Sequence, residues 1–276
     1  MTEPVRLDQR AVVSVNGPDA ESFLQGLVTQ DVLGLARGQR RYAALLTPQG
    51  KIIADMILER SDEGFLVDCD RDAALLLLKR LNLFRLRARV TIEARPDLAV
   101  IAFDGSADPR SPEAPPRRIG PPVETQGDPL AYHAMRIAAG LAEQGADFGA
   151  DEVFPADINM DLQGGVDFRK GCFVGQEVVS RMKRRGIARR RTLRVGFHGE
   201  APAPPCPLLA NDFEIGTLTS VAGATGLARV RIDRLAEAER DGEGFSASGV
   251  RLAFHHPDWL AGEIAGLEAS KSSRAD

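Results

Sequence analysis

Hydrophobic residues in the first hundred positions follow two different periods. Short stretches rich in β-branched residues and bounded by turn residues predict strands, and they occupy residues 11–15, both halves of 41–60 around a Pro-Gln-Gly turn, 65–69, 88–94 and 99–103. Apolar residues at helical spacing predict helices at residues 18–28 and 71–84. This order of strands and helices matches a ferredoxin-like unit with an extra strand.

The pattern is interrupted after this unit. Residues 104–129 are dense in proline and glycine, which predicts a loop or linker because neither residue continues a helix or a central strand. A helix is expected to follow over residues 130–145, with Met135 and Ile137 turned inward.

The last third of the chain changes again. After Arg191, short alternating stretches separated by turn residues predict a small β-barrel or sandwich. Residues 270–276 are expected to form a solvated tail. We therefore expect an α+β protein with two regions, residues 1–190 and residues 191–276.

Composition excludes several classes of protein. The 276 residues are 43% hydrophobic and 27% charged, as in ordinary folded chains, and the net charge of −4 gives no global attraction to nucleic acid. No stretch approaches the ~20 apolar residues of a membrane span, and the first residues lack the apolar core of a signal peptide.

The cysteines and histidines limit metal chemistry and redox compartment. Cys69, Cys172 and Cys206 are odd in number and form no CxxC pair, so neither a disulfide framework nor a four-cysteine metal site is expected. The four histidines have no ligand spacing with them, and we expect no metal site in this chain alone. Reduced thiols suit the cytoplasm.

The stretch DFRKGCFVGQEVVSR, residues 167–181, carries the strongest candidate chemistry. Lys170 and Arg169 would favour the thiolate of Cys172, and Gly171 would let a ligand approach the backbone closely. A cysteine between glycines is also common as a small buried hydrophobe. From the local residues alone, both interpretations stay open.

Three further features each have a functional and an ordinary interpretation. Gln176 and Glu177 could pair with the edge of a heterocycle, or simply begin a solvated helix. Asp55, flanked by apolar residues, lies either on the wet face of a strand or in a pocket with a raised pKa. The basic run at residues 181–191 could hold phosphates, a polyanionic cofactor tail or RNA, or could be a solvated connector.

The segment INMDLQGGVDFRKGCFVGQEVVSRMKRRG, residues 158–186, resembles the signature of the YgfZ family. These proteins are folate-binding relatives of the glycine-cleavage T-protein (aminomethyltransferase) that support iron–sulfur cluster assembly or repair. Three more segments are similar in the same order: GPDAESFLQGLVTQDV, LLTPQGKIIADMIL and YHAMRIAAGLAEQGADFGADEVFPADINMD. The resemblance covers most of residues 10–190.

The resemblance implies a ring of two interleaved ferredoxin-like units and a C-terminal β-barrel around a central folate pocket. It implies that Cys172 is the signature thiol and that Asp55 lies where the T-protein keeps its catalytic acid. Residues of the motif would then contact tetrahydrofolate or a one-carbon derivative: Lys170 and Gly171 in the loop, Gln176 and Glu177 at the pterin, and Arg181 and Lys183 at the glutamate carboxylates.

The chain departs from the T-protein at two positions. In a gapless alignment the pterin-binding glutamate of the T-protein falls on Phe168, and its paired aspartates are here Ala54 and Asp55. Both departures argue against ordinary aminomethyl transfer and leave folate binding plausible.

The sequence therefore predicts a monomeric cytoplasmic accessory protein for iron–sulfur client enzymes or assembly proteins, which binds tetrahydrofolate and depends on Cys172. One alternative is a folate-dependent one-carbon transferase with Asp55 as acid or base. Another is an RNA-binding module that uses residues 181–194, although nucleic acid is not the expected partner.

Overall fold

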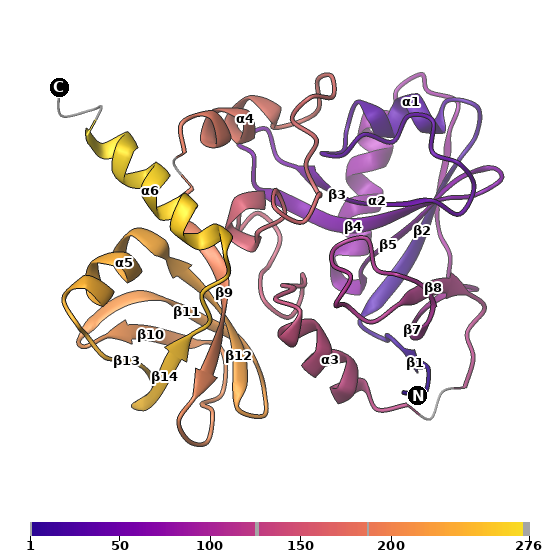
Figure 1. The fold of residues 1–276 in the computed structure, drawn as a ribbon. Coiled ribbons are helices and arrows are strands. Elements are labelled where there is room, and N and C mark those ends of the chain that lie inside the picture. The colour runs from indigo at the N-terminus through magenta and orange to yellow at the C-terminus, as the bar shows by residue number, and fades with distance from the viewer. Residues whose placement is uncertain (1, 125–126, 187, 273–276) are drawn as a thin grey trace.

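The computed structural model describes residues 2–124, 127–186 and 188–272. Figure 1 shows the β-barrel and the helices packed on it at one end of the molecule, and the β-sheets with their helices at the other. The segment that follows helix α3 (Pro129–Ala138) crosses from the sheets to the barrel. It contains a loop of residues 167–175, called the motif loop, and helix α4 (Gln176–Arg184). Among the described residues, no helix is long and apolar enough to cross a membrane.

The larger sheet is antiparallel, with strand order β3-β4-β5-β2-β6. Its strands are β2 (Arg10–Asn16), β3 (Arg40–Leu46), β4 (Ile52–Arg60), β5 (Gly64–Asp70) and β6 (Thr91–Ala94). Helices α1 (Ala20–Gln25) and α2 (Arg71–Arg85) cover one face. Asp70 caps α2 by accepting the N–H of Ala73 at 2.9 Å. These elements match the expected strands and helices closely.

Both faces of this sheet are covered. Val67 and Leu77 belong to the core between the sheet and its helices. On the opposite face, Tyr42 and Ile57 pack with Phe148 and other residues that follow α3. Every residue of β4 from Ile52 to Leu58 is therefore buried.

The second sheet has the order β1-β7-β8. Its strands are β1 (Val5–Arg6), β7 (Ala99–Ser106) and β8 (Arg117–Gly120). β8 lies inside residues 104–129, so the prediction of a structureless linker is wrong there. Ile119 pairs with Val100 and packs beside the cluster that contains Tyr132; this apolar contact and the ladder to β7 outweigh the local proline content.

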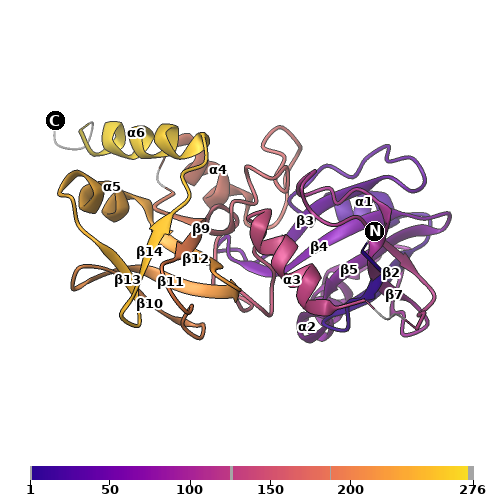
Figure 2. The ribbon, with the colours of Figure 1, turned by 60° about the horizontal axis from the view of Figure 1, so that its bottom comes forward.

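Helix α3 (Pro129–Ala138) contacts β1 on one side and, on the other, the barrel strands β11 (Phe213–Ala222) and β12 (Thr225–Arg231). Figure 2 shows it lying between the two parts. It ends before the expected residue 145, since Gly140 adopts φ +70°. Ile137 is buried as predicted, but Met135 is 39% exposed, so its predicted inward orientation is wrong.

The C-terminal region forms a closed barrel, as predicted, with the order β10-β11-β12-β9-β14-β13. Its strands are β9 (Arg190–Phe197), β10 (Cys206–Ala210), β11 (Phe213–Ala222), β12 (Thr225–Arg231), β13 (Phe245–Ala247) and β14 (Val250–Phe254). Helices α5 (Ile232–Arg240) and α6 (Trp259–Ser272) were not predicted. The expected tail is helical up to Ser272, and its remaining residues lie outside the described ranges.

A buried network of charged side chains joins the two sheets. The guanidinium of Arg117 lies 3.0 Å from carboxylate oxygens of Asp68 and of Asp108, and 3.3 Å from Glu143. None of these side chains is more than 3% exposed. Burial alone would raise the pKa of Glu143. The surrounding arginines, of which Arg110 has the largest effect, instead hold this pKa well below its usual range.

A second part of the network joins α3 to the barrel. Nη1 of Arg136 lies 2.6 Å from Asp147 Oδ2, and Nη2 donates to Ser220 Oγ at 2.8 Å. The hydroxyl of Thr219 donates to the other oxygen of Asp147 at 2.7 Å. Buried ion pairs of this kind fix orientation, because each side chain left without a partner would be an uncompensated buried charge.

We predict that Arg117→Met destabilises the chain by about 3–5 kcal/mol, because it leaves buried carboxylates without their shared cation. Urea unfolding followed by circular dichroism measures the change. The control is Arg37→Ala, which removes an ion pair to Asp62 whose side chains are 78% and 65% exposed, and it should change stability by less than about 0.5 kcal/mol. Equal effects of the two variants would contradict a structural role for the network.

Candidate functional site

The motif loop, residues 167–175, leads into helix α4 (Gln176–Arg184). The loop begins with a turn at Asp167, whose Oδ1 accepts the backbone N–H groups of Arg169 at 2.7 Å and Lys170 at 3.3 Å. An aspartate bonded to the backbone two residues ahead favours a turn. The N–H of Asp167 donates to the carbonyl of Thr29 at 3.0 Å, so the turn is attached to the segment before β3.

Lys170 anchors the loop from within. Its ammonium group donates to the carbonyl oxygens of Val28 at 2.7 Å and Gln30 at 2.9 Å, and lies 5.4 Å from the ring centroid of Phe173. Burial lowers the pKa of this amine to about 8. The charge that was predicted to favour the Cys172 thiolate is therefore bound by two backbone carbonyls.

Phe173 and Gly175 anchor the other side of the loop. Phe173 is buried in the cluster that contains Leu46 and Val179. Gly175 adopts φ +79°, and a Cβ there would lie 2.6 Å from the carbonyl oxygen of Thr47. Only glycine fits this close approach between the loop and the turn that joins β3 to β4.

Between these anchors, Gly171 and Cys172 are exposed. Apart from Gly171 and its two chain neighbours, no heavy atom lies within 4 Å of the point where a Cβ on Gly171 would stand, so the space around this residue is open. Cys69 and Cys206 are buried, at 0% and 9% exposure. The interpretation of Cys172 as a small buried hydrophobe is therefore wrong, because an anchored loop holds the thiol out to solvent.

Asp55 lies in the core. Its Oδ2 accepts the hydroxyl of Tyr42 at 3.1 Å, and its backbone N–H donates to Oε1 of Gln144 at 3.1 Å. Oδ1 is buried and has no hydrogen-bond partner among the described residues. Burial raises the pKa of the carboxyl, against the opposing charges of Arg10 and Arg110.

The position of Asp55 decides between its two sequence interpretations. A position on a wet face is wrong, since the sheet is covered on both sides and the residue is 1% exposed. The raised pKa agrees with the buried alternative. Asp55 and Cys172 do not share a site here, because one is enclosed and the other is in solvent.

The residues expected to contact folate do not enclose a pocket together. A pterin site needs convergent polar groups in a concave, largely apolar pocket. Glu177, Arg181 and Lys183 are exposed along α4, and Gln176 is half-buried. The orphaned Oδ1 of Asp55 could accept a hydrogen bond, but the residue is closed to a ligand. These residues do not fit folate in the predicted arrangement, and their role toward it stays a prediction.

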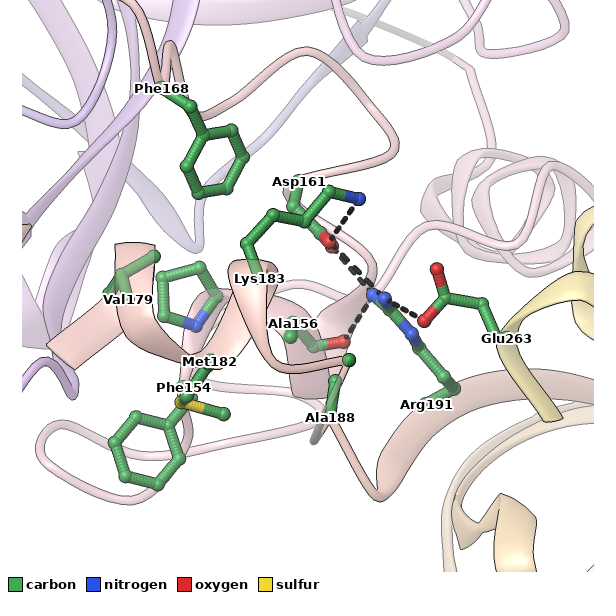
Figure 3. A pocket seen from close by; sticks show the side chains of 12 residues that line it. Phe154, Ala156, Asp161, Phe168, Val179, Met182, Lys183, Ala188, Arg191 and Glu263 are labelled. Atoms are coloured by element: carbon green, nitrogen blue, oxygen red, sulfur yellow. Dashed lines mark hydrogen bonds and ion pairs between the residues drawn. The ribbon is translucent and has the colours of Figure 1, made fainter. Parts of the chain in front are cut away.

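The basic run is not a single exposed face. Arg191 is 1% exposed; its Nη1 lies 2.6 Å from Asp161 Oδ1, and its Nη2 lies 2.6 Å from Glu263 Oε2. Arg191, in strand β9 of the barrel, therefore joins the barrel both to the segment around Asp161 and to α6 (Figure 3). A cationic surface for RNA would lack this residue.

Within residues 2–124, 127–186 and 188–272, no group of three or more histidine, cysteine or acidic side chains could hold a metal ion. The thiol of Cys172 is the reactive group that the loop presents. For a soft metal it could supply a single thiolate ligand.

The sequence did not identify the residues that support the loop. The hydroxyl of Thr29 donates to the Gly165 carbonyl at 2.6 Å and accepts the N–H of Ala44 at 2.9 Å. The side-chain amide of Gln30 donates to the carbonyl of Gly164. The sequence Asp-x-x-Lys-Gly could have predicted the turn at Asp167. The partners of the loop at residues 28–30 are distant in sequence, and no local pattern predicts their contacts.

We predict that Cys172 reacts with iodoacetamide before the other two cysteines at neutral pH. Burial raises the pKa of the Cys69 thiol to about 12, so Cys69 is both protonated and shielded; Cys206 is shielded by the barrel core. Mass spectrometry of peptides over a labelling time course measures the order, with Cys172→Ser as the control. Earlier labelling of Cys69 or Cys206 would contradict the described exposure.

Comparisons with known proteins agree with this architecture. The GCVT N-terminal domain model matches residues 8–107, and the model of the CAF17 C-terminal beta-barrel domain matches residues 189–262. The crystal structure of glycine cleavage system aminomethyltransferase T from Bartonella henselae superposes with a TM-score of 0.72 over 92% of this chain and 84% of that one, at 18% identity. At this identity the match establishes the fold alone.

Curated relatives identify the family. The chain is 32% identical to the human mitochondrial iron-sulfur cluster assembly factor IBA57, covering 92% of this chain and 84% of the human protein. Homologs from Neurospora crassa and Pyricularia oryzae are both 31% identical to this chain. The match to the Neurospora crassa protein covers 73% of this chain and 55% of that protein, and the match to the Pyricularia oryzae protein covers 72% and 58%. The chain thus spans just over half the length of these fungal relatives. All three are named as mitochondrial, so the cytoplasmic prediction is not confirmed. The chain belongs to the IBA57 family of iron–sulfur cluster assembly factors, built on the fold of the glycine-cleavage T-protein.

Proposed function

We propose that this chain supports the assembly or repair of iron–sulfur enzymes through the thiol of Cys172. The observation that carries the proposal is the exposed thiol on a loop held from inside by Lys170 and Phe173. A cysteine is among the most frequently buried residue types, so a loop that keeps one in solvent favours a chemical role. The naming of the relatives as iron-sulfur cluster assembly factors supports the same role.

The cluster, or its iron, is the cargo in this proposal. Thiolates are the usual ligands of iron–sulfur clusters. Since the described residues hold no group of three candidate ligands, Cys172 would supply one ligand or one sulfur nucleophile, and the remaining ligands would come from the cargo or from another protein. We expect a reducing compartment such as the cytoplasm, because the three cysteines are free.

The narrower resemblance to YgfZ proteins and the binding of tetrahydrofolate form a separable part of the proposal. The motif from Lys170 to Glu177 supports the first. For the second, the support is the resemblance alone, since Glu177 is exposed and Asp55 is closed to a ligand. We therefore assign no step of the function to folate.

We predict that Cys172→Ala reduces support of iron–sulfur enzymes to the level of the empty vector in cells that lack the native protein. The substitution removes an exposed sulfur, so chain levels should stay unchanged. Glu177→Gln is the matched control, because it changes an exposed residue of the neighbouring helix, and it should restore enzyme activity fully. Growth and cluster-enzyme activity are the readouts.

Asp55→Asn distinguishes this role from a one-carbon transferase. The accessory role predicts near-normal support by this variant, whereas a transferase that uses Asp55 as acid or base would lose it and would tolerate Cys172→Ala. Full rescue by Cys172→Ala would overturn the proposal.

Isothermal titration with tetrahydrofolate tests the separable part. Wild type and Cys172→Ala should bind it with equal affinity if folate and thiol act independently. The absence of binding heat would remove folate and leave the role of the thiol intact.

A further inference from the structure

Helix α2 carries apolar side chains on two opposite sides. Its inner side packs on the larger sheet through Ala73, Leu77 and Leu81 (Figure 1). Leu75 is 61% exposed and Leu83 is 64% exposed. By helical periodicity these two leucines lie on the side of α2 that faces away from the sheet. They therefore stand in solvent and add nothing to the core.

Leu86 extends this exposed set past the last turn of the helix. It is the C-cap residue of α2, and its side chain is 89% exposed. Its backbone adopts φ +40°, in the left-handed region that leucine rarely occupies because its Cβ crowds the backbone. The side chain gains no packing that would offset this cost. We refer to Leu75, Leu83 and Leu86 as the outer leucines of α2.

Unpaired cations lie among the outer leucines. Residues 73–92 contain five basic residues and no acid. Arg89 is paired with Asp19 at 2.9 Å. The other four are exposed and have no ion pair within the described residues: Lys79, Arg80, Arg85 and Arg87. The single carboxylate on α2 itself is Asp72, in its first turn. This surface therefore favours a partner that is both apolar and anionic.

The exposure of the outer leucines favours a bilayer over a protein as that partner. A protein interface receives its apolar anchors in preformed pockets, so it would need a separate hollow for each projecting leucine. The interface of a bilayer admits apolar side chains at any spacing, while the stems of lysine and arginine reach back to the lipid headgroups. A second copy of the chain would bring two basic surfaces together, which like-charge repulsion opposes.

We propose that the outer side of α2 binds the surface of an anionic lipid bilayer. The outer leucines enter the headgroup boundary, and Lys79 and Arg85 contact lipid phosphates. Three leucines and a few cations give reversible peripheral binding, with the helix lying along the surface.

This orientation leaves the motif loop accessible. Phe173 of that loop packs in the cluster on the face of the larger sheet that α2 does not cover. A bilayer on α2 would therefore not cover Cys172, and the proposal does not depend on the role of the thiol.

Co-sedimentation of the full chain with phosphatidylcholine vesicles, with and without phosphatidylglycerol, tests the proposal at physiological ionic strength. We expect binding to the anionic vesicles and at least about tenfold weaker binding to the neutral ones, because each basic residue near an anionic surface contributes about a factor of five. High salt should release the chain, since it screens this attraction.

A pair of leucine substitutions tests the apolar contact. Leu83→Ser combined with Leu86→Ser should weaken binding to the anionic vesicles about tenfold or more, because burial of each leucine contributes at least about that factor. The matched control combines Leu130→Ser with Phe213→Ser, which change two side chains that are each 72% exposed outside α2. The control should bind as wild type does, and both variants should keep the wild-type circular dichroism spectrum.

A pair of charge substitutions tests the contact with phosphates. Lys79→Gln combined with Arg85→Gln should weaken binding about tenfold or more. Arg184→Gln combined with Arg189→Gln removes the same charge from exposed positions in the other basic run, and it should change binding less than about twofold.

Several outcomes would overturn the proposal: no binding to anionic vesicles, equal binding to neutral ones, or equal effects of either α2 pair and its control. Light scattering that shows a dimer in wild type and a monomer in the Leu83→Ser, Leu86→Ser variant would instead assign the surface to a second copy. Binding of an acidic, leucine-rich helical peptide without binding of vesicles would instead assign it to a protein partner.

Discussion

The two hydrogen bonds from the Lys170 ammonium to the carbonyls of Val28 and Gln30 are the contact on which the candidate site depends. They join the motif to a segment about 140 residues earlier in the chain. Without them the loop would lose its internal anchor between Asp167 on one side and Phe173 and Gly175 on the other, and two carbonyls would lose their donor. The exposure of Cys172 is thus a consequence of a buried cation two residues away.

The position of that cation is set by the larger sheet and by the charged network behind it. Thr29 bonds both to the first edge of the sheet and to the turn before the motif, so the loop is registered against β3. Arg117 and Arg136 join this part to the second sheet and to the barrel. The carboxylate of Asp55 belongs to the same interior, where Arg10 and Arg110 oppose the burial that raises its pKa. Charge within this core therefore maintains the arrangement of the parts, while the reactive thiol lies outside it.

The spacing of apolar residues and the positions of turn residues were sufficient to predict the larger sheet and the barrel. In these strands either every residue or every second residue is apolar, and glycine or proline bounds them. β8 was missed because its pairing with β7 is a tertiary contact inside a proline-rich stretch. The predicted orientation of Met135 was wrong because the buried side of α3 carries Tyr132, Arg136 and Ile137, and Met135 lies outside it. For the site, the sequence identified Cys172 as a candidate, but the partners of Lys170 are carbonyl groups, which carry no side-chain signal. Folate contacts predicted from the resemblance, such as Glu177, were not brought into an enclosed pocket.

The most direct measurement is the activity of iron–sulfur enzymes in cells that carry Lys170→Met, at equal levels of folded chain. This substitution keeps the apolar stem and removes the ammonium that holds the loop, while Cys172 itself is unchanged. We predict a loss of support comparable to that of Cys172→Ala, because the thiol would no longer be held in one position. Wild-type activity in these cells would contradict the claim that the anchored loop is what makes the thiol functional.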